Sequence, residues 1–379
     1  MARRYRYTDD AKGCAIQMKV NRNIKTPLYR QVYEAIKADI LNNHYRESDF
    51  LPSERELGDM FQVDRVTVRK ALDLLVAEGL VEKTASVGTR VKLPDYSLIT
   101  GKTIMFILPK RGNEDERITG SFNSNLFYVV EEECKERRCR VIYTTIDEDE
   151  RLVECLKGYD IAGVIFVSKN DIRVYEEAKS LGIPTVLVND YYPGFNSVLI
   201  DNQTGAYEAI RYLLDRGHSK IAAIAGVPEY PASQERLVGF WRAMVDAGLD
   251  LNQYPVQHGY WTYDGGYECM HRLLSDFEDD CPSAVFAFND WMAYGAIHAI
   301  EEYGMRVPDD VSVVGFNDID LPIAGKLKLT TVRVDIDLMG KSAVEYLQKV
   351  VENNDGTSLK IVVPTSLIIG DSVRAVEAT

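Results

Sequence analysis

Cysteine and histidine are scarce in this chain, and their scarcity argues against several classes of protein. Six cysteines are spread over 379 residues, and Cys134 and Cys139 form an isolated C-x4-C with no second pair. The five histidines show no spacing typical of metal ligands. A disulfide framework or a zinc site is therefore not expected, and a reducing cytoplasm is the favoured location. We predict no metal and no other cofactor.

Long apolar runs and familiar catalytic motifs are also absent. No segment approaches the ~18 uninterrupted apolar residues of a membrane helix, and the basic N-terminus lacks the apolar core of a signal peptide. G-x-x-x-x-G-K-[ST], H-E-x-x-H and G-x-S-x-G do not occur. The sequence favours a protein that is not an enzyme and has no membrane partner. An enzyme acting on a sugar or nucleotide through Asp190, Asp290 and Asp318 is the alternative.

The charge is distributed unevenly. Residues 1–95 hold 17 Lys and Arg against 14 Asp and Glu, a net charge of +3. The other 284 residues hold 27 against 44, a net charge of −17, which gives −14 for the whole chain. A basic segment joined to an acidic one is typical of a DNA-binding module attached to a domain that does not touch DNA. Chance fluctuation with a basic tail is the alternative.

The basic segment has the pattern of three helices and a two-stranded wing. Ser53 and Glu56 fit a capping box, and Asp64 is a suitable N-cap for the helix after it. The expected ranges are 27–43, 53–61 and 65–78 for the helices, and 80–83 and 88–91 for the strands. A winged helix-turn-helix places the start of its third helix in the major groove. Arg65 and Arg69 lie on one face there, although a solvated basic face on an ordinary helix would look the same.

The local sequence carries a resemblance that favours DNA binding. TPLYRQVYEAI, LPSERELGDMFQVDRVTVRKALDLLVAEGLVEK and GTRV resemble the GntR-family DNA-binding domain over about 65 residues. This resemblance implies DNA contacts from Arg55, Arg65, Thr67 and Arg69, with phosphate contacts from Lys83 and Arg90. The chain departs from the family at Asp64, where Ser or Thr is usual, and at the wing tip, 84–88.

After a short polar linker, strand-like and helix-like patterns alternate. Apolar runs are expected to form strands at 103–108, 141–143, 163–167, 185–188, 198–200, 221–225, 284–288 and 311–315. Amphipathic stretches between them predict helices at 126–135, 205–215, 234–247, 267–277 and 291–303. Continuous apolar strands separated by helices indicate parallel sheets covered on both faces. The length indicates two such sheets.

Polar and aromatic residues follow these strands, where ligands bind in open α/β sheets. Amide oxygens, an arginine fork and flat aromatic faces suit a polyhydroxylated ligand. The candidate effector-binding residues are Lys110, Phe127, Asn189, Arg236, Trp261, Asn289 and Asn317. Asn at a strand end is often only a turn former, and a tryptophan often only packs.

A second resemblance covers most of this acidic segment. GVPEYPASQERLVGFWRAM, VFAFNDWMAYGAIHAI and RVPDDVSVVGFNDIDL look like the ligand domain of the lac-repressor and galactose-repressor family, a relative of periplasmic sugar-binding proteins. It implies two lobes joined by three crossovers, at about 102–200 with 331–353 and about 201–317 with 361–375. It also implies Arg236 and Asn289 as hydroxyl ligands and Trp261 as an aromatic wall. Asn317 departs from the usual Asp.

The two resemblances together are similar to the arabinose repressor group. They imply an α/β protein with an N-terminal winged helix-turn-helix and a two-lobed periplasmic-binding-protein-like domain of parallel sheets. The expected segments are a basic extension at 1–25, the DNA-binding domain at 26–93, a linker at 94–101 and the effector domain at 102–379. Such a regulator binds operator double-stranded DNA as a homodimer and is released from it by a small sugar effector. The resemblance implies L-arabinose or another pentose as that effector. A purine or an amino acid in the same cleft stays open.

Overall fold

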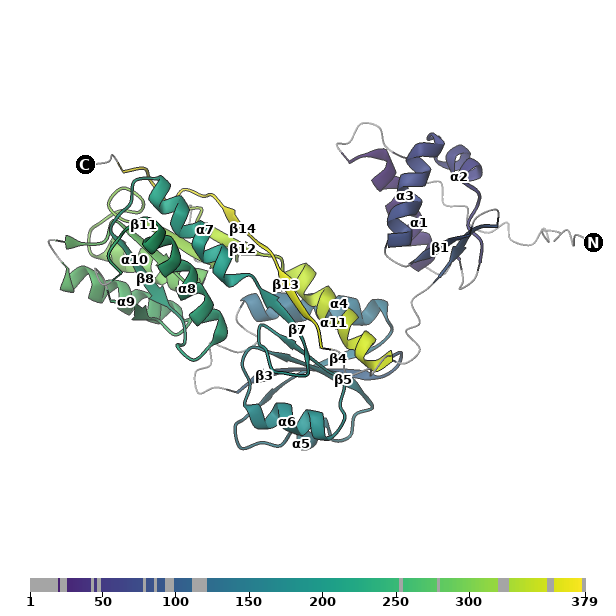
Figure 1. Ribbon diagram of the computed structural model, residues 1–379, viewed down its shortest axis with the longest axis horizontal. Coiled ribbons are helices and arrows are strands. Elements are labelled where there is room, and N and C mark those ends of the chain that lie inside the picture. Colours follow the sequence, from purple (N-terminus) through teal and green to yellow (C-terminus); the bar gives the residue numbers. More distant parts are fainter. Residues whose placement is uncertain are drawn as a thin grey trace, which may run out of the picture. The chain divides into compact units, whose positions relative to one another are not determined.

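The chain forms two compact units, Met1–Asp95 and Tyr96–Thr379 (Figure 1). The computed structural model describes residues 20, 26–41, 44–45, 49–77, 80–84, 87–92, 99–110, 121–251, 255–277, 280–319, 327–352 and 358–376. The expected extension at 1–25 therefore lies outside the described residues except for Val20, as does most of the expected linker. Ile99, at the end of that linker, is fully buried in the core of the second unit.

The first unit has the predicted winged helix-turn-helix architecture. Its elements are α1 (Leu28–Leu41), α2 (Glu54–Phe61), α3 (Arg65–Ala77), β1 (Val81–Thr84) and β2 (Gly88–Val91). The inward side chains of α1 and α3 meet in one small core with Leu57 of α2 and Val81 and Val91 of the wing. β1 and β2 pair antiparallel, which confirms the predicted hairpin.

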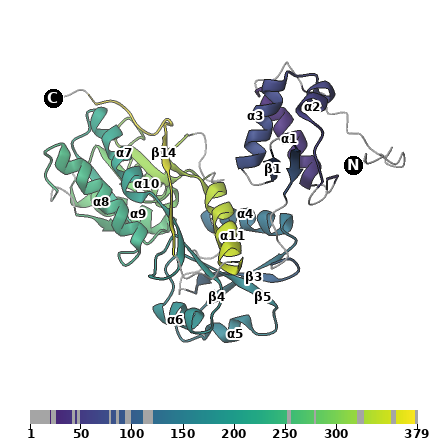
Figure 2. The ribbon, with the colours of Figure 1, turned by 45° about the vertical axis from the view of Figure 1, so that its right-hand side comes forward.

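The second unit contains two six-stranded sheets, each forming one lobe. The sheet of lobe 1 has the order β13-β7-β6-β5-β3-β4, and its described strands are all parallel. Its elements are β3 (Thr103–Pro109), α4 (Ser121–Glu136), β4 (Arg140–Ile146), α5 (Leu152–Leu156), β5 (Ile161–Val167), α6 (Ile172–Ser180), β6 (Thr185–Val188), β7 (Asn196–Ile200), α11 (Ile336–Glu352) and β13 (Lys360–Val363). Helices α4 and α11 pack together over one face of the sheet, and α5 and α6 cover the other (Figures 1 and 2).

The sheet of lobe 2 has the order β14-β12-β11-β10-β8-β9, with β14 antiparallel to its neighbour. Its elements are α7 (Asn202–Asp215), β8 (Ile221–Ala225), α8 (Pro231–Asp246), β9 (Gln257–His258), α9 (Tyr263–Asp276), β10 (Ala284–Ala287), α10 (Asp290–Glu302), β11 (Ser312–Asn317), β12 (Thr330–Val334) and β14 (Thr365–Ile368). Helices α7 and α8 pack as one pair and α9 and α10 as another. Buried apolar strands covered by helices explain why the strands read as continuous apolar runs.

The chain crosses between the lobes three times, as expected, but two of the segments are assigned differently. β12 belongs to lobe 2 and β13 to lobe 1, so the second crossing follows Val334 and the third lies between Val363 and Thr365. The expected boundaries at 331 and 361 were therefore wrong. β12 pairs with β11 and β14, and β13 pairs with β7, and neither partnership is visible in a local apolar pattern.

Candidate functional site

A cavity of about 130 Å³ lies between the two lobes, at the carboxyl ends of their strands. Lobe 1 contributes the end of β3, the start of α4 and the residues after β5 and β6. Lobe 2 contributes α8, the loop before α9, the segment after β10 and the last residue of β11. The lining residues are Leu108, Pro109, Phe122, Asn123, Ser168, Asn189, Tyr230, Ala232, Arg236, Trp261, Asn289 and Asn317. Five of the seven predicted effector residues are therefore brought to one place.

Arg236 is the only arginine in the described lining of the cavity, and it is 3% exposed. Its Nε donates to Asn202 Oδ1 at 2.8 Å, its Nη1 donates to the carbonyl oxygen of Phe288, and its guanidinium carbon lies 3.6 Å from the centre of the Phe316 ring. Burial lowers the pKa of Arg236 to about 9, while the charges of Asp290 and Glu235 act to raise it. The guanidinium thus stays a cation at neutral pH and is held in one plane.

Asn317 Oδ1, an acceptor, and Trp261 Nε1, a donor, are buried at the cavity and have no hydrogen-bond partner among the described residues. A buried polar group left unpaired costs about 1–3 kcal/mol, so such groups in a native protein call for an explanation. A ligand that both donates and accepts hydrogen bonds would satisfy both atoms.

Strained backbone gathers around the same cavity. Ser168, Asn189, Trp261 and Asn317 have φ values of 60°, 57°, 68° and 112°. Side chains rarely tolerate this region, and residues held in it cluster at functional sites. The Asn289 side chain fixes one of them, because its Nδ2 donates to Trp261 O at 2.8 Å while its Oδ1 accepts from Met292 N at 2.8 Å. Asn289 is thus both a lining residue and the N-cap of α10.

A buried carboxyl supports the strained turn at the end of β11. Asp290 accepts from the Thr331 hydroxyl at 2.6 Å and from Ile319 N–H at 2.8 Å. Burial raises its pKa to about 7. A Cβ at Gly315 would lie 2.2 Å from Asp290 Oδ1, so only glycine allows this carboxyl to reach the turn that carries Asn317.

Two predicted effector residues do not line the cavity. Lys110 is exposed and forms an ion pair with Asp147 at 3.3 Å. Phe127 packs edge-on against Phe106 and Tyr143, with ring centres 5.3 and 6.3 Å apart, because it lies on the face of α4 that covers the sheet. Asn123, Ser168 and Tyr230 were not among the predicted effector residues, but they do line the cavity. Ser168 directly follows an apolar strand, as Asn189 does, so its position at a strand end is a signal that could have identified it.

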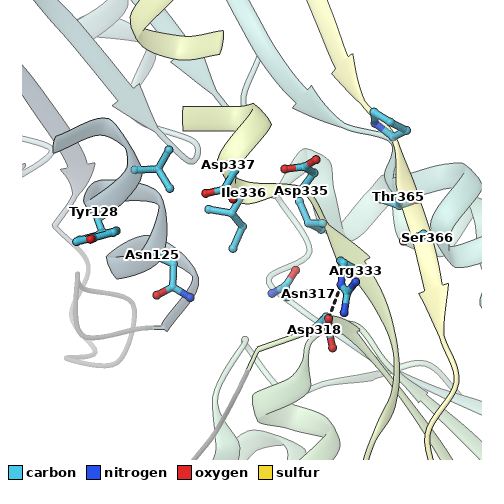
Figure 3. Close-up of a pocket in the computed structure, with 13 residues that line it drawn as sticks. Asn125, Tyr128, Asn317, Asp318, Arg333, Asp335, Ile336, Asp337, Thr365 and Ser366 are labelled. Carbon is cyan, nitrogen blue, oxygen red and sulfur yellow. Dashed lines mark hydrogen bonds and ion pairs between the residues drawn. The ribbon is translucent and has the colours of Figure 1, made fainter. Parts of the chain in front are cut away.

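A second, larger cavity of about 600 Å³ lies at the crossovers and shares Asn317 with the first (Figure 3). Its carboxylates are already engaged in part: Arg333 Nε donates to Asp318 Oδ2 at 2.6 Å, and Asp335 Oδ1 accepts from Leu338 N at 2.8 Å. No tryptophan stands in its described lining. The smaller cavity, where a buried arginine, a tryptophan and unpaired polar atoms converge, is the better candidate for the effector.

The predicted DNA-binding residues lie on α2, α3 and the wing. The capping box is confirmed, since Ser53 N–H donates to Glu56 Oε2 at 2.8 Å and Glu56 N–H donates to Ser53 Oγ at 3.3 Å. Gln62 then takes a left-handed conformation, with φ of 53°, and Asp64 Oδ1 accepts from Thr67 N–H at 2.7 Å. The acid at position 64 thus serves as the N-cap of α3.

Five of the predicted contact side chains are exposed cations on these elements. Arg55, Arg65 and Arg90 are exposed, whereas Thr67 is half-buried. Arg69 is exposed too but is held by Glu54, with Nε···Oε1 at 3.2 Å and Nη2···Oε2 at 2.9 Å. On the wing, Lys83 pairs with Asp73 of α3 at 2.5 Å. The tip residues 85–86 lie outside the described part of the chain.

Comparisons with known proteins match both units. Residues 28–91 match the family described as bacterial regulatory proteins, gntR family, and residues 210–373 match the periplasmic binding protein-like domain. Catabolite control protein A of Priestia megaterium is 31% identical over 279 residues, which are 72% of this chain and 77% of that protein. The HTH-type transcriptional repressor PurR of Haemophilus influenzae is 36% identical over 51% of this chain, which spans only 58% of that repressor.

Solved structures give the same fold for the second unit. A LacI family transcriptional regulator from Enterococcus faecium with bound ribose superposes with a TM-score of 0.65 at 23% identity, over 73% of this chain and all of that one. Among the described residues, no helix is long and apolar enough to cross a membrane. With a gntR-type head, a LacI-type two-lobed domain and a relative matched over most of its length, this chain belongs to the bacterial transcriptional regulators that join a GntR DNA-binding domain to a periplasmic-binding-protein-like domain.

Proposed function

We propose that this regulator is a sugar-responsive repressor, which binds operator DNA as a homodimer and releases it when a small sugar enters the cleft. L-Arabinose or another pentose is the first candidate. The observation that carries the proposal is the cavity with Arg236, Trp261 Nε1 and Asn317 Oδ1 around it. Vicinal hydroxyls both donate and accept, so one sugar ring can satisfy two donors and an acceptor while its apolar face rests on the indole.

The size of the cavity supports a small ligand. Its volume of about 130 Å³ is below the ~300 Å³ at which drug-sized sites begin. Aromatic Trp261, with Tyr230 at 6.4 Å between ring centres, offers a stacking face for a planar base as well. A purine is therefore the second candidate.

The described lining of the cavity supports binding in preference to catalysis. It contains no Asp, Glu or His. Asp190, one of the carboxylates considered for an enzyme, is buried and accepts from the Tyr175 hydroxyl at 2.6 Å, and burial raises its pKa. Glycoside hydrolysis requires two carboxyl groups that flank one bond. We therefore propose a binding protein without catalytic activity.

The coupling we propose follows from the two lobes and their contact across the cleft. Lys169 Nζ, which follows β5 of lobe 1, donates to Glu229 O before α8 of lobe 2 at 2.9 Å. A ligand that favours the closed cleft shifts the population toward that state by its differential affinity for it. In a dimer, rotation of the lobes would change the separation of two recognition helices, which must fit half-sites ~34 Å apart. The coupling must be reciprocal, so operator DNA should weaken sugar binding equally.

The test is a thermal-shift screen of the full chain and of Arg236→Ala against pentoses, hexoses, sugar phosphates and purines. A ligand at a hundred times its Kd stabilises the folded state by about 2.7 kcal/mol. We expect a pentose to stabilise the wild type but not the variant, and the same pentose to release a selected operator duplex. A purine hit would overturn the sugar assignment, and a full response from Arg236→Ala would overturn the site.

A further inference from the structure

Asn202 stands directly beside the crossover from lobe 1 to lobe 2, outside the lining of the effector cavity. It is the first residue of α7, whose N-cap is Asp201, and it is 2% exposed. Both ends of its side chain are used: Oδ1 accepts from Arg236 Nε at 2.8 Å, and Nδ2 donates to Glu235 Oε2 at 2.9 Å. The side chain therefore connects two consecutive residues of α8, one facing the cavity and one facing away.

The chemistry of the neighbours leaves Asn202 only one orientation. A guanidinium can only donate, so the amide oxygen must face Arg236, and an ionised carboxylate can only accept, so the amide NH2 must face Glu235. Rotating the amide by half a turn would set donor against donor and acceptor against acceptor. Glu235 thus determines how Asn202 presents its oxygen to Arg236.

The other contacts of Arg236 do not determine its rotation in the plane by themselves. The Phe316 ring sets the plane of the guanidinium, and the Phe288 carbonyl accepts from Nη1. The bond from Nε to Asn202 Oδ1 is the second in-plane restraint. With both restraints present, the free N–H groups point in one direction, which is what a directional hydrogen bond to a ligand requires.

We propose that Asn202, oriented by Glu235, is a positioning residue for Arg236. Asn202 thereby sets the direction of the hydrogen bonds that Arg236 donates to the effector. This inference rests on the proposed function in taking Arg236 as an effector ligand. Glu235 also lines an outer cavity of about 480 Å³ together with Asn202, Glu208 and Arg242, and it is half-buried, whereas Asn202 is 2% exposed. Asn202 therefore links the carboxylate of Glu235, at the outer cavity, to Arg236, which lines the effector cavity.

The first measurement needs no effector. In the full chain labelled with 15N-arginine, the Nε–H signal of Arg236 is assigned by its loss in Arg236→Lys, and its hydrogen exchange is measured. We expect at least tenfold faster exchange in Asn202→Leu, which has similar size but no acceptor, and faster exchange in Glu235→Ala. Glu208→Ala, on the same outer cavity, is the matched control and should leave exchange unchanged.

A role swap guards against variants that simply fail to fold. Asn202→Asp with Glu235→Gln keeps the net charge and restores both hydrogen bonds, because the carboxylate can accept from Arg236 and from the new amide. We expect wild-type exchange in this double variant. Slow exchange in Asn202→Leu and Glu235→Ala, or fast exchange in the swap, would overturn the proposal.

The second measurement uses L-arabinose as the probe. Losing this restraint should weaken its binding about tenfold in Asn202→Leu, with sugar-free operator affinity unchanged and binding rescued in the swap. Wild-type L-arabinose affinity in a folded Asn202→Leu would overturn the positioning role. If L-arabinose fails to bind the wild type, the proposed effector is wrong, while the exchange measurement still decides whether Asn202 holds Arg236.

Discussion

Substituting Gly226 by alanine should push the Trp261 indole into the effector cavity and reduce the space for the ligand. Gly226 follows β8, and a Cβ built there would lie 2.1 Å from Trp261 Cζ2, 2.2 Å from Cε2 and 2.4 Å from Cη2. Ordinary contact begins at 3.4 Å, so the indole must move by at least 1.3 Å, the difference between 3.4 and 2.1 Å. Because Trp261 lines the cavity and Gly226 does not, the free direction for the ring is into the ligand's space.

Overpacking of this kind costs about 1–3 kcal/mol, which corresponds to about fivefold to 140-fold in an equilibrium constant. We expect Gly226→Ala to lose sugar affinity on that scale, as measured by isothermal titration with the sugar that the screen identifies. Operator affinity without sugar should be unchanged, because Gly226 belongs to the second unit.

The matched control is Gly226→Ala combined with Trp261→Phe. The smaller ring lacks the benzo atoms that meet the new methyl group, so the two substitutions should be strongly non-additive. If Gly226→Ala binds sugar and unfolds as the wild type does, the indole does not form the wall of the site and the reasoning fails.

Three further predictions concern other parts of the chain. Arg65→Ala should weaken binding to a selected operator by about 1–3 kcal/mol, measured by fluorescence anisotropy, and should weaken binding to scrambled DNA less. If the variant binds the operator as tightly as the wild type does, Arg65 does not contact the DNA. Lys169→Ala removes the 2.9 Å bond to Glu229 O across the cleft, so sugar affinity should fall severalfold, and an unchanged Kd would mean that this bond does not favour closure. Burial lowers the pKa of His218, whose ring contacts Ser283 Oγ at 2.9 Å and Arg374 O at 3.1 Å. The unfolded chain thus binds a proton first, so stability should fall as pH drops through about 6.5, and His218→Gln should lose that slope in urea titrations at pH 7.5 and 5. Parallel slopes would contradict this.

Much of the fold follows from local pattern. β6 and β8 coincide with the apolar runs at 185–188 and 221–225, because strands buried on both faces need apolar side chains at every position. β12 and β13 were placed in the wrong lobes because a strand's choice of sheet depends on partners far away in the sequence, such as β7 for β13.

The site was predicted less evenly, for a similar reason. Position after a strand identifies where a Cα lies but not where its side chain points. Asn189 lines the cavity, whereas Lys110 extends toward Asp147 and Phe127 packs under its own helix. Asn202 carried no signal of its own, because its importance lies in a contact with Arg236, 34 residues away.

The ion pair between Glu54 and Arg69 has a consequence for how the regulator responds to ionic conditions. A cation releases counterions from DNA only to the extent that it neutralises phosphate, and each phosphate so neutralised adds about −0.9 to the slope of log K against log salt. Arg69 already has a carboxylate partner, as does Lys83 with Asp73. If the proposed function holds, DNA binding by the winged helix-turn-helix domain therefore releases fewer counterions than its number of basic residues implies. The ratio of its affinities for operator and for other DNA should then change less with salt concentration than it would if binding were purely electrostatic.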